Sequence, residues 1–161
     1  MSNQVQAQVP DKDQAFKCVT FCLDDETYGI NVLQVREVLR VSEIAPVPGA
    51  PANVRGVINL RGNVVTVVDA RRSFRMAARP VDDAARIVVV EIDEHVIGLF
   101  VDAVAEVLEL TQSMVESAPS VGNEEGSRYI DGVVNHPGGI LILIDVRKML
   151  NDDEWKQLAA M

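Results

Sequence analysis

The sequence has few aromatic residues and no excess of positive charge. Aromatic residues make up only 4% of the 161 positions, whereas hydrophobic residues make up 48%. Valine, isoleucine and leucine must therefore carry the core, and β-branched side chains pack well on strands. The formal net charge of -9 argues against nucleic-acid binding, which relies on clustered lysine and arginine. The composition predicts a globular, β-rich chain that is long enough to bury its own core.

Long hydrophobic runs and targeting signals are also missing. The longest apolar stretches, residues 64–68 and 140–144, are far shorter than the roughly 20 residues that a membrane helix needs. Residues 1–8 have neither the basic end nor the apolar stretch of a signal peptide. We therefore expect a cytoplasmic protein with no direct membrane insertion, in which the two apolar stretches are buried strands.

Patterns that carry catalysis or bind metals are absent from the sequence. The only histidines, His95 and His136, fall in presumed turns, and there is no HExxH, CxxC, Walker or dinucleotide-binding motif. Cys18 and Cys22 are four residues apart on one expected strand, about 13 Å at the usual rise. A disulfide needs Cα atoms closer than about 7 Å, so these two cysteines cannot bridge each other. We expect no catalytic residue, no cofactor and no metal.

Most of the chain is an internal repeat of two similar copies. Residues 18–41 match residues 87–110 at eight of 24 positions, and residues 54–74 match residues 130–150 at six of 21. Chance identity at this composition is roughly one in fifteen. The offset is 69 in the first block and 76 in the second, so copy two carries a seven-residue insertion within residues 111–129. Copy one spans about residues 16–80 and copy two about residues 81–150.

Each copy predicts the same short elements. Two apolar strands flank an acidic turn at residues 24–26 and again at residues 93–95, which is typical of a hairpin. Residues 32–41 and 101–110 suit either a helical turn or an irregular strand, and we expect a turn that leads into a strand. Residues 51–56 have proline early and glycine late, which predicts a very short helix. The fold class is therefore all-β, with two similar small β-barrel subdomains and short helices.

The residues shared by the copies indicate the scaffold. Asp69 and Asp145 each end a strand, and helix capping explains both better than a catalytic pair of carboxylates. Asn59 and Gly62 recur in copy two, which is turn chemistry. Glu37 and Glu106 are also equivalent, and one of them could bind a local backbone group or an arginine.

The residues that differ between the copies indicate the working surface. Leu60 and Arg61 in the first turn become His136 and Pro137 in the second, so the scaffold does not require them. An arginine on a rigid tight turn is a good anchor for a protein partner. Drift on an exposed loop is the alternative explanation, and it stays open at this point.

The two ends of the chain lie outside the repeat. Residues 1–15 are polar, and we expect a disordered tail. Residues 151–161 predict a terminal helix capped by Asn151, with Trp155 and Leu158 on its apolar stripe.

Several motifs resemble those of the CheW family of chemotaxis coupling proteins. They are DDETYGI at residues 24–30, the step from Val35 through Glu37 to Val38, the prolines at 46, 48 and 51, GVINLRG at residues 56–62, and the closing strands from residue 132 to 145. The resemblance covers residues 16–155. It implies two five-stranded β-barrels around a groove, and leaves open whether they exchange a strand.

The resemblance also implies a function and a set of partners. A CheW-like protein is a non-catalytic adaptor that couples the cytoplasmic tips of methyl-accepting chemoreceptors to the regulatory domain of the histidine kinase CheA. It is recruited to receptor arrays at the inner membrane, where CheW–CheW contacts also form. The partner-binding residues that follow from the match are Val35, Glu37, Val38, Leu60, Arg61 and Val64. A coupling protein of a non-flagellar chemosensory pathway and a generic β-barrel interaction module stay open as alternatives.

Overall fold

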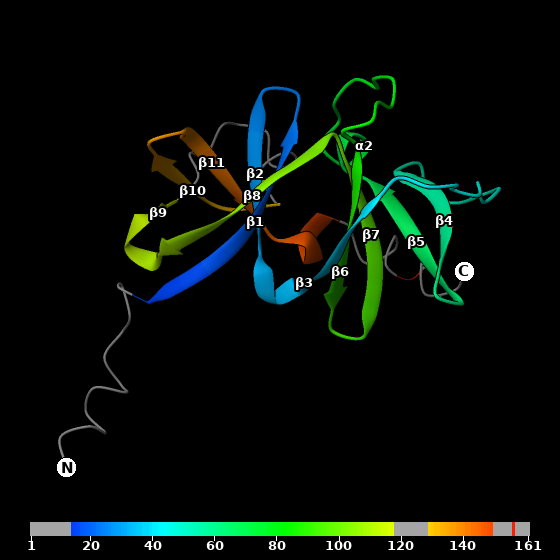
Figure 1. Ribbon diagram of the computed structural model, residues 1–161, viewed down its shortest axis with the longest axis horizontal. Coiled ribbons are helices and arrows are strands. Elements are labelled where there is room, and N and C mark those ends of the chain that lie inside the picture. Colours follow the sequence, from blue (N-terminus) through cyan, green and yellow to red (C-terminus); the bar gives the residue numbers. More distant parts are fainter. Residues whose placement is uncertain (1–13, 118–128, 150–155, 157–161) are drawn as a thin grey trace, which may run out of the picture.

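The computed structural model describes residues 14–117, 129–149 and 156 (Figure 1). The expected tail lies outside these residues except at its end, where the first strand already begins at Ala15. The expected insertion in copy two lies largely outside them as well. The predicted terminal helix, with Asn151, Trp155 and Leu158, is also outside them, apart from Lys156, which is helical and exposed.

The first sheet, sheet A, has six strands in the order β8-β1-β2-β11-β10-β9. Neighbours pair antiparallel except β2 and β11, which run parallel. Its strands are β1 (Ala15–Leu23), β2 (Glu26–Asn31), β8 (Ala103–Thr111), β9 (Val115–Glu116), β10 (Ile130–His136) and β11 (Gly139–Ile144).

The second sheet, sheet B, has five strands in the order β3-β6-β7-β5-β4. Again one pair, β5 with β7, runs parallel. Its strands are β3 (Val35–Arg40), β4 (Val54–Leu60), β5 (Asn63–Asp69), β6 (Arg86–Ile92) and β7 (His95–Val101). The helical turns are η1 (Val32–Gln34), α2 (Ala70–Ser73), η2 (Gln112–Met114) and η3 (Val146–Met149). The predicted all-β class is confirmed.

The two sheets do not coincide with the two copies of the repeat. The first hairpin of copy one, β1–β2, joins sheet A, whose other strands come from copy two. The first hairpin of copy two, β6–β7, joins sheet B, whose other strands come from copy one. Figure 1 shows the blue hairpin beside the brown β10 and β11, far from β4 and β5. Each sheet therefore needs residues from both halves of the chain.

Local structure departs from the sequence prediction in two places. The short helix predicted at residues 51–56 is wrong, because these residues form a turn in which the Val54 N–H donates to the Pro51 carbonyl at 3.0 Å. β4 then begins at Val54, and the Asp69 N–H donates to the preceding Asn53 carbonyl at 2.7 Å, which favours an extended chain over a helix. The turn and strand predicted at residues 32–41 are confirmed by η1 and β3. The equivalent residues of copy two bend at Asp102 and continue as β8 without a helical turn.

The largest core cluster lies between the sheets and takes residues from both. Phe21 and Ile30 of sheet A pack in one cluster with Val88 and Leu99 of sheet B, all fully buried. Smaller clusters fill the inner faces of each sheet. Full burial of one such side chain contributes about 1.5–3 kcal/mol. The sheets therefore stabilise one another.

Most of the scarce aromatic residues lie in this core or pack against it. Phe21 stacks on Tyr28, Tyr28 on Phe74, and Phe74 contacts Tyr129, with ring centroids 5.2–5.4 Å apart. Four of the six Phe and Tyr residues thus form one row. The row links β1 and β2 to the segment after α2, so these few rings join parts that are distant in sequence.

The two equivalent aspartates cap helical turns, as the sequence predicts. Asp69 Oδ1 accepts hydrogen bonds from the backbone N–H groups of Arg71 and Arg72 at 2.9 and 3.3 Å. Asp145 Oδ1 accepts from the Arg147 N–H at 2.9 Å. Asp69 has an additional partner, because its Oδ2 accepts from Arg55 Nη1 at 2.9 Å.

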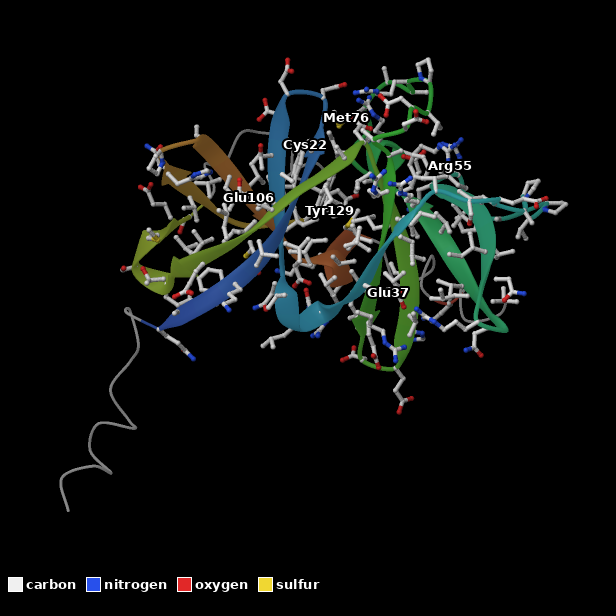
Figure 2. All side chains as sticks on the ribbon, viewed as in Figure 1. Cys22, Glu37, Arg55, Met76, Glu106 and Tyr129 are labelled. Atoms are coloured by element: carbon white, nitrogen blue, oxygen red, sulfur yellow. The ribbon has the colours of Figure 1, made fainter. Side chains whose placement is uncertain are left out.

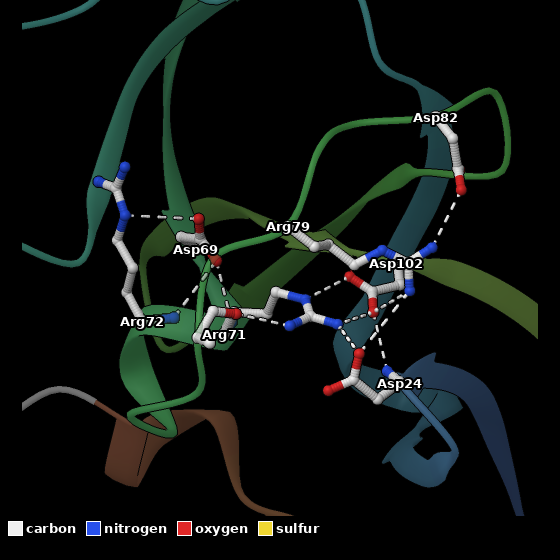
Figure 3. Close-up of polar contacts among 8 residues, drawn as sticks. Asp24, Asp69, Arg71, Arg72, Arg79, Asp82 and Asp102 are labelled. Atoms are coloured by element: carbon white, nitrogen blue, oxygen red, sulfur yellow. Dashed lines mark hydrogen bonds and ion pairs between the residues drawn. The ribbon is translucent and has the colours of Figure 1, made fainter.

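A cluster of ion pairs joins the sheets where the chain crosses between them. Arg71 follows β5 of sheet B, and its Nε and Nη2 donate to the two carboxylate oxygens of Asp102 at 2.8 and 2.6 Å (Figure 3). Arg71 also pairs with Asp24, in the β1–β2 turn of sheet A. The Asp24 N–H donates to Asp102 at 2.8 Å, and Arg79 contacts the same carboxylate at 3.2 Å. The side chains of Arg71 and Asp102 are each only 8% exposed.

The repeat places a weaker copy of this contact elsewhere in the molecule. Arg147 and Asp93 are the equivalents of Arg71 and Asp24, and they pair at 3.7 Å. Both of these side chains are largely exposed. Leu33 stands where Asp102 would be in the other copy. Among the described residues, the Arg71 contact thus has a buried carboxylate at its centre, whereas the Arg147–Asp93 pair is largely exposed.

We expect Asp102→Asn to lower the free energy of unfolding by about 1–3 kcal/mol, because it leaves the buried Arg71 guanidinium with less compensating charge. Asp93→Asn is the matched control at the exposed copy, with an expected loss below about 0.5 kcal/mol. Urea unfolding at neutral pH measures both. Equal losses in the two variants would contradict the special role of the buried contact.

The Asp102 pair also predicts a pH dependence. Burial raises the pKa of Asp102, but hydrogen bonds from Arg71 and from the Asp24 N–H outweigh it and hold the pKa below its usual range. A carboxyl group with a lowered folded pKa adds stability above its unfolded pKa, about 3.9, and loses it as pH falls through the folded pKa. The stability gap between wild type and Asp102→Asn should therefore narrow below about pH 4. A gap that stays constant in urea titrations down to acid pH would contradict this.

We expect Asp69→Ala to lower the free energy of unfolding by about 1–2 kcal/mol through loss of the cap, and Asp145→Ala by about 1 kcal/mol or less. The expected loss of unfolding free energy is larger at Asp69 because its carboxylate also binds Arg55. Partner binding should survive in Asp69→Ala. An unchanged melting curve for Asp69→Ala would contradict the capping role.

Candidate functional site

The β4–β5 turn holds Arg61 in a defined position. Asn59 Oδ1 accepts a hydrogen bond from the Gly62 N–H at 2.8 Å, which fixes the turn. Arg61 and Gly62 both have positive φ, at 51° and 88°. The second of these suits glycine, and the first is uncommon for arginine. The turn chemistry predicted from the repeat is therefore confirmed, and it presents the Arg61 side chain.

Arg61 forms a two-pronged ion pair with Glu37 of β3. Its Nη1 and Nη2 donate to the two oxygens of the Glu37 carboxylate, each at 2.7 Å. The hydrogen bond from Arg61 is the main cause that lowers the pKa of Glu37, and the same bond raises the pKa of Arg61. Arg61 remains 70% exposed and Glu37 26% exposed, so the pair lies at the surface. Two parallel N–H···O bonds fix the plane of the guanidinium as well as its position.

The ion pair connects two strands that are far apart in the sheet order. Glu37 lies on β3 at one edge of sheet B, and Arg61 follows β4 at the other edge. Sheet B curves enough for its ends to meet, because Ala45, shortly after β3, pairs with Val57 of β4. Gly56 has φ of +149°, and a Cβ atom there would collide with the Ala45 carbonyl oxygen. The curvature of the sheet therefore builds the site.

An open groove of about 590 Å3 surrounds the ion pair. Its lining residues come from every strand of sheet B or from the β4–β5 turn: Arg36, Glu37, Leu60, Arg61, Asn63, Val64, Val65, Val89 and Val96. Val64 is 74% exposed, so the groove offers apolar surface beside a charged pair. A rigid arginine beside exposed aliphatic groups is typical of the anchor region of a protein interface.

The structure brings four of the six predicted partner-binding residues to this groove. Glu37, Leu60, Arg61 and Val64 line it. Val35 is half-buried and packs against the core between the sheets. Val38 is exposed on β3 but is not among the residues that line the groove.

The equivalent place in sheet A lacks the ion pair. Glu106 of β8 is the counterpart of Glu37, and Figure 2 shows the two on different sheets. Pro137 stands where Arg61 would be, so it offers no side-chain donor. The Glu106 backbone instead exchanges hydrogen bonds with the Thr20 hydroxyl at 2.7 and 3.0 Å. The comparison of the two copies thus found one place where the sheets differ in surface chemistry.

Sequence reasoning missed the part of the groove that comes from copy two. Val89 and Val96 belong to β6 and β7, the hairpin that joins sheet B from the other half of the chain. Glu91, also on β6, pairs with Arg36 at 3.3 Å. No motif links these residues to Arg61 in the sequence. The pairings of β3 with β6 and of β5 with β7 bring them together.

The described residues form no metal-binding cluster, and their cysteines are unpaired. No group of three or more His, Cys, Asp or Glu side chains among them could hold a metal ion. Cys18 and Cys22 are both free, as predicted, and burial raises the pKa of Cys18 to about 11, which disfavours a reactive thiolate. In the same part of the chain, no helix is long and apolar enough to cross a membrane.

Comparison with known proteins assigns the chain to a family. The family model for the CheW-like domain matches residues 17–154. The chain is 31% identical to the chemotaxis protein CheW of Treponema pallidum, over 91% of this chain and 89% of that one. It is 30% identical to CheW of Bacillus subtilis, over 89% and 91% of the two chains.

A solved structure shows the same fold. The crystal structure of the scaffolding protein TtCheW from Thermoanaerobacter tengcongensis matches with a TM-score of 0.80 and 30% sequence identity. The match covers 88% of this chain and 96% of that one. Sequence and fold agree, and the chain belongs to the CheW-like family of chemotaxis coupling proteins.

Proposed function

We propose that this chain is a non-catalytic scaffold that couples chemoreceptor tips to the regulatory domain of the histidine kinase CheA. Membership of the CheW-like family carries this proposal. The chain would act in the cytoplasm and be recruited to receptor arrays at the inner membrane, with contacts between copies of the chain as a further element of the array. The doubled fold suits such a role, because it offers two related but non-identical surfaces to different partners.

We further propose that the groove around Arg61 binds one of these partners. Glu37 occupies two of the five N–H donors of the Arg61 guanidinium, and the others remain available for a partner. Because the ion pair already fixes the side chain, little conformational entropy is lost when a partner binds. Glu37 then acts as a positioning residue for Arg61, and Leu60 and Val64 supply apolar contact. Val35 and Val38 lie on β3 with Glu37, outside the lining of the groove.

The first experiment measures kinase coupling. Mixing the chain with CheA and a receptor fragment should raise autophosphorylation of the kinase in a manner that depends on all three components. A chain that binds neither protein, or that leaves autophosphorylation unchanged, would contradict the proposed coupling. Binding of both proteins without an effect on the kinase would favour a generic interaction module.

We expect Arg61→Ala to weaken at least one of the two partner complexes by about tenfold, which is the scale of an interface anchor. Arg36→Ala is the matched control, because Arg36 lines the same groove and is also an exposed arginine in an ion pair. It should change affinity less than threefold or so, as is usual for an exposed pair. Titrations against the kinase regulatory domain and against a receptor tip fragment measure both variants. Unchanged affinities of Arg61→Ala for both partners would contradict the proposal.

The role of Glu37 is tested by exchanging the charges. Glu37→Gln should weaken the same complex as Arg61→Ala, but less, because one neutral amide cannot hold both guanidinium donors as a carboxylate does. The double variant Glu37→Arg with Arg61→Glu should keep the pair and the fold, yet still fail to bind, since the partner meets the wrong charge. Full binding by the double variant would show that the pair serves the fold alone.

A further inference from the structure

The two sheets contain an equivalent place that is filled in one and open in the other. It lies where the last strand of each copy ends, at the capping aspartates Asp69 and Asp145. Two further pairs of equivalent positions differ in residue type: Arg55 near Asp69 corresponds to Asp131 near Asp145, and Phe100 corresponds to Asn31. All six residues line the respective cavities. The chain thus contains the same site twice, with different residues at equivalent positions.

In sheet B the site is closed by an arginine of the chain itself. The Arg55 guanidinium carbon lies 4.1 Å from the centroid of the Phe100 ring, and its Nη1 donates to Asp69 Oδ2 at 2.9 Å. Residues 78–82 line the same place. The remaining cavity is about 40 Å3. Asp69 thus binds backbone N–H groups with one oxygen and a guanidinium with the other.

In sheet A the corresponding groove is open and holds about 420 Å3. Asp131 replaces the arginine, and the smaller Asn31 replaces the aromatic ring. Asp145 Oδ1 accepts from the Arg147 N–H, as Asp69 Oδ1 does from Arg71. Lys148 Nζ lies 3.9 Å from Asp131 Oδ1.

One part of this groove is apolar. Phe16, Cys18, Val115 and Leu143 line it beside the polar Gln34 and Gln112, and Leu33, also in the lining, is 90% exposed. Large exposed aliphatic side chains beside a concave surface are typical of interaction sites. At the three compared positions, the open site has Asn31 and two carboxylates, beside an apolar wall, where its counterpart has a ring, one carboxylate and an arginine.

We propose that this sheet A groove, lined by Asn31, Leu33, Asp131 and Asp145, binds an arginine side chain that a partner protein presents next to an apolar residue. The arginine would take the place that Arg55 fills in sheet B, with its guanidinium on Asp145 Oδ2 and Asp131. Arginine fits better than lysine, because its planar fork bridges two carboxylates and its flat face tolerates apolar surroundings. The groove lies apart from Arg61, on the other sheet, so a second partner can bind there.

The test titrates the full chain with a minimal probe, N-acetyl-arginine amide, and measures chemical shift changes of the protein by two-dimensional NMR. Saturable shifts should appear at Asn31, Leu33 and Leu143, with no comparable shifts at Glu37 or Arg61. N-acetyl-citrulline amide is the matched control, since it keeps the shape of the side chain and loses the charge. Absence of saturable shifts, or equal shifts with both probes, would overturn the proposal.

Two variants sharpen the result. Asp131→Asn should weaken binding of the arginine probe by threefold or more, the scale of one charge-assisted hydrogen bond at a partly exposed site. The double variant Asn31→Phe with Asp131→Arg rebuilds the sheet B version of the site, and it should keep its fold and lose the shifts. If the double variant unfolds, Asp131→Asn alone decides the question. Unchanged affinity in Asp131→Asn would overturn the proposal.

The same spectra distinguish the other possible occupants. Nuclear Overhauser contacts between residues 150–161 and Leu33 in the free chain would show that the chain fills its own groove. Shifts at Leu33 that grow with protein concentration alone would show that a second copy does so. Either outcome would overturn a site for a different partner protein.

Discussion

The exchange of hairpins between the two copies is the constraint on which the rest of this structure depends. Two parallel pairings, β5 with β7 and β11 with β2, place the first hairpin of each copy in the sheet of the other. Neither half of the chain can complete a sheet alone. The chain must also cross between the sheets at η1 and at Asp102. The shared core and the ion pairs of Arg71 lie between the sheets, so hydrophobic burial and electrostatics both hold the exchanged arrangement together.

The two copies have diverged at particular places on this common frame. Arg61 occupies the position of Pro137, so sheet B has a surface ion pair that sheet A lacks. Arg55 against Asp131 closes a site in sheet B and leaves it open and acidic in sheet A. Asp102 occupies the position of Leu33 in the other copy, so the Arg71 ion pair is buried while the equivalent Arg147–Asp93 pair lies at the surface. A duplicated scaffold can change such positions at little cost to its fold, and an adaptor needs different surfaces for different partners.

Local chemistry could be read from the sequence where a residue acts on its own neighbourhood. Asp69 and Asp145 cap turns that begin directly after them, and Asn59 and Gly62 fix a turn only four residues long. The short helix predicted from Pro51 and Gly56 was wrong, because the segment forms a turn that leads directly into β4, and backbone bonds to Asp69 and Ala45 hold the chain there. Gly56 is required there for close backbone approach and not for ending a helix. Local propensity lost to tertiary pairing at that point.

The sequence by itself determined the all-β class, the duplication, the caps and turns, and Arg61 as a residue that the scaffold does not need. These features depend on interactions within a few residues or on comparison of equivalent positions. Only the tertiary structure decided that Arg61 pairs with Glu37, that Val89 and Val96 complete its groove, and that Arg71 is buried against Asp102. Those contacts join residues that are 24 or more positions apart. They exist because the sheets curve and exchange hairpins, and a single sequence carries no local signal for either.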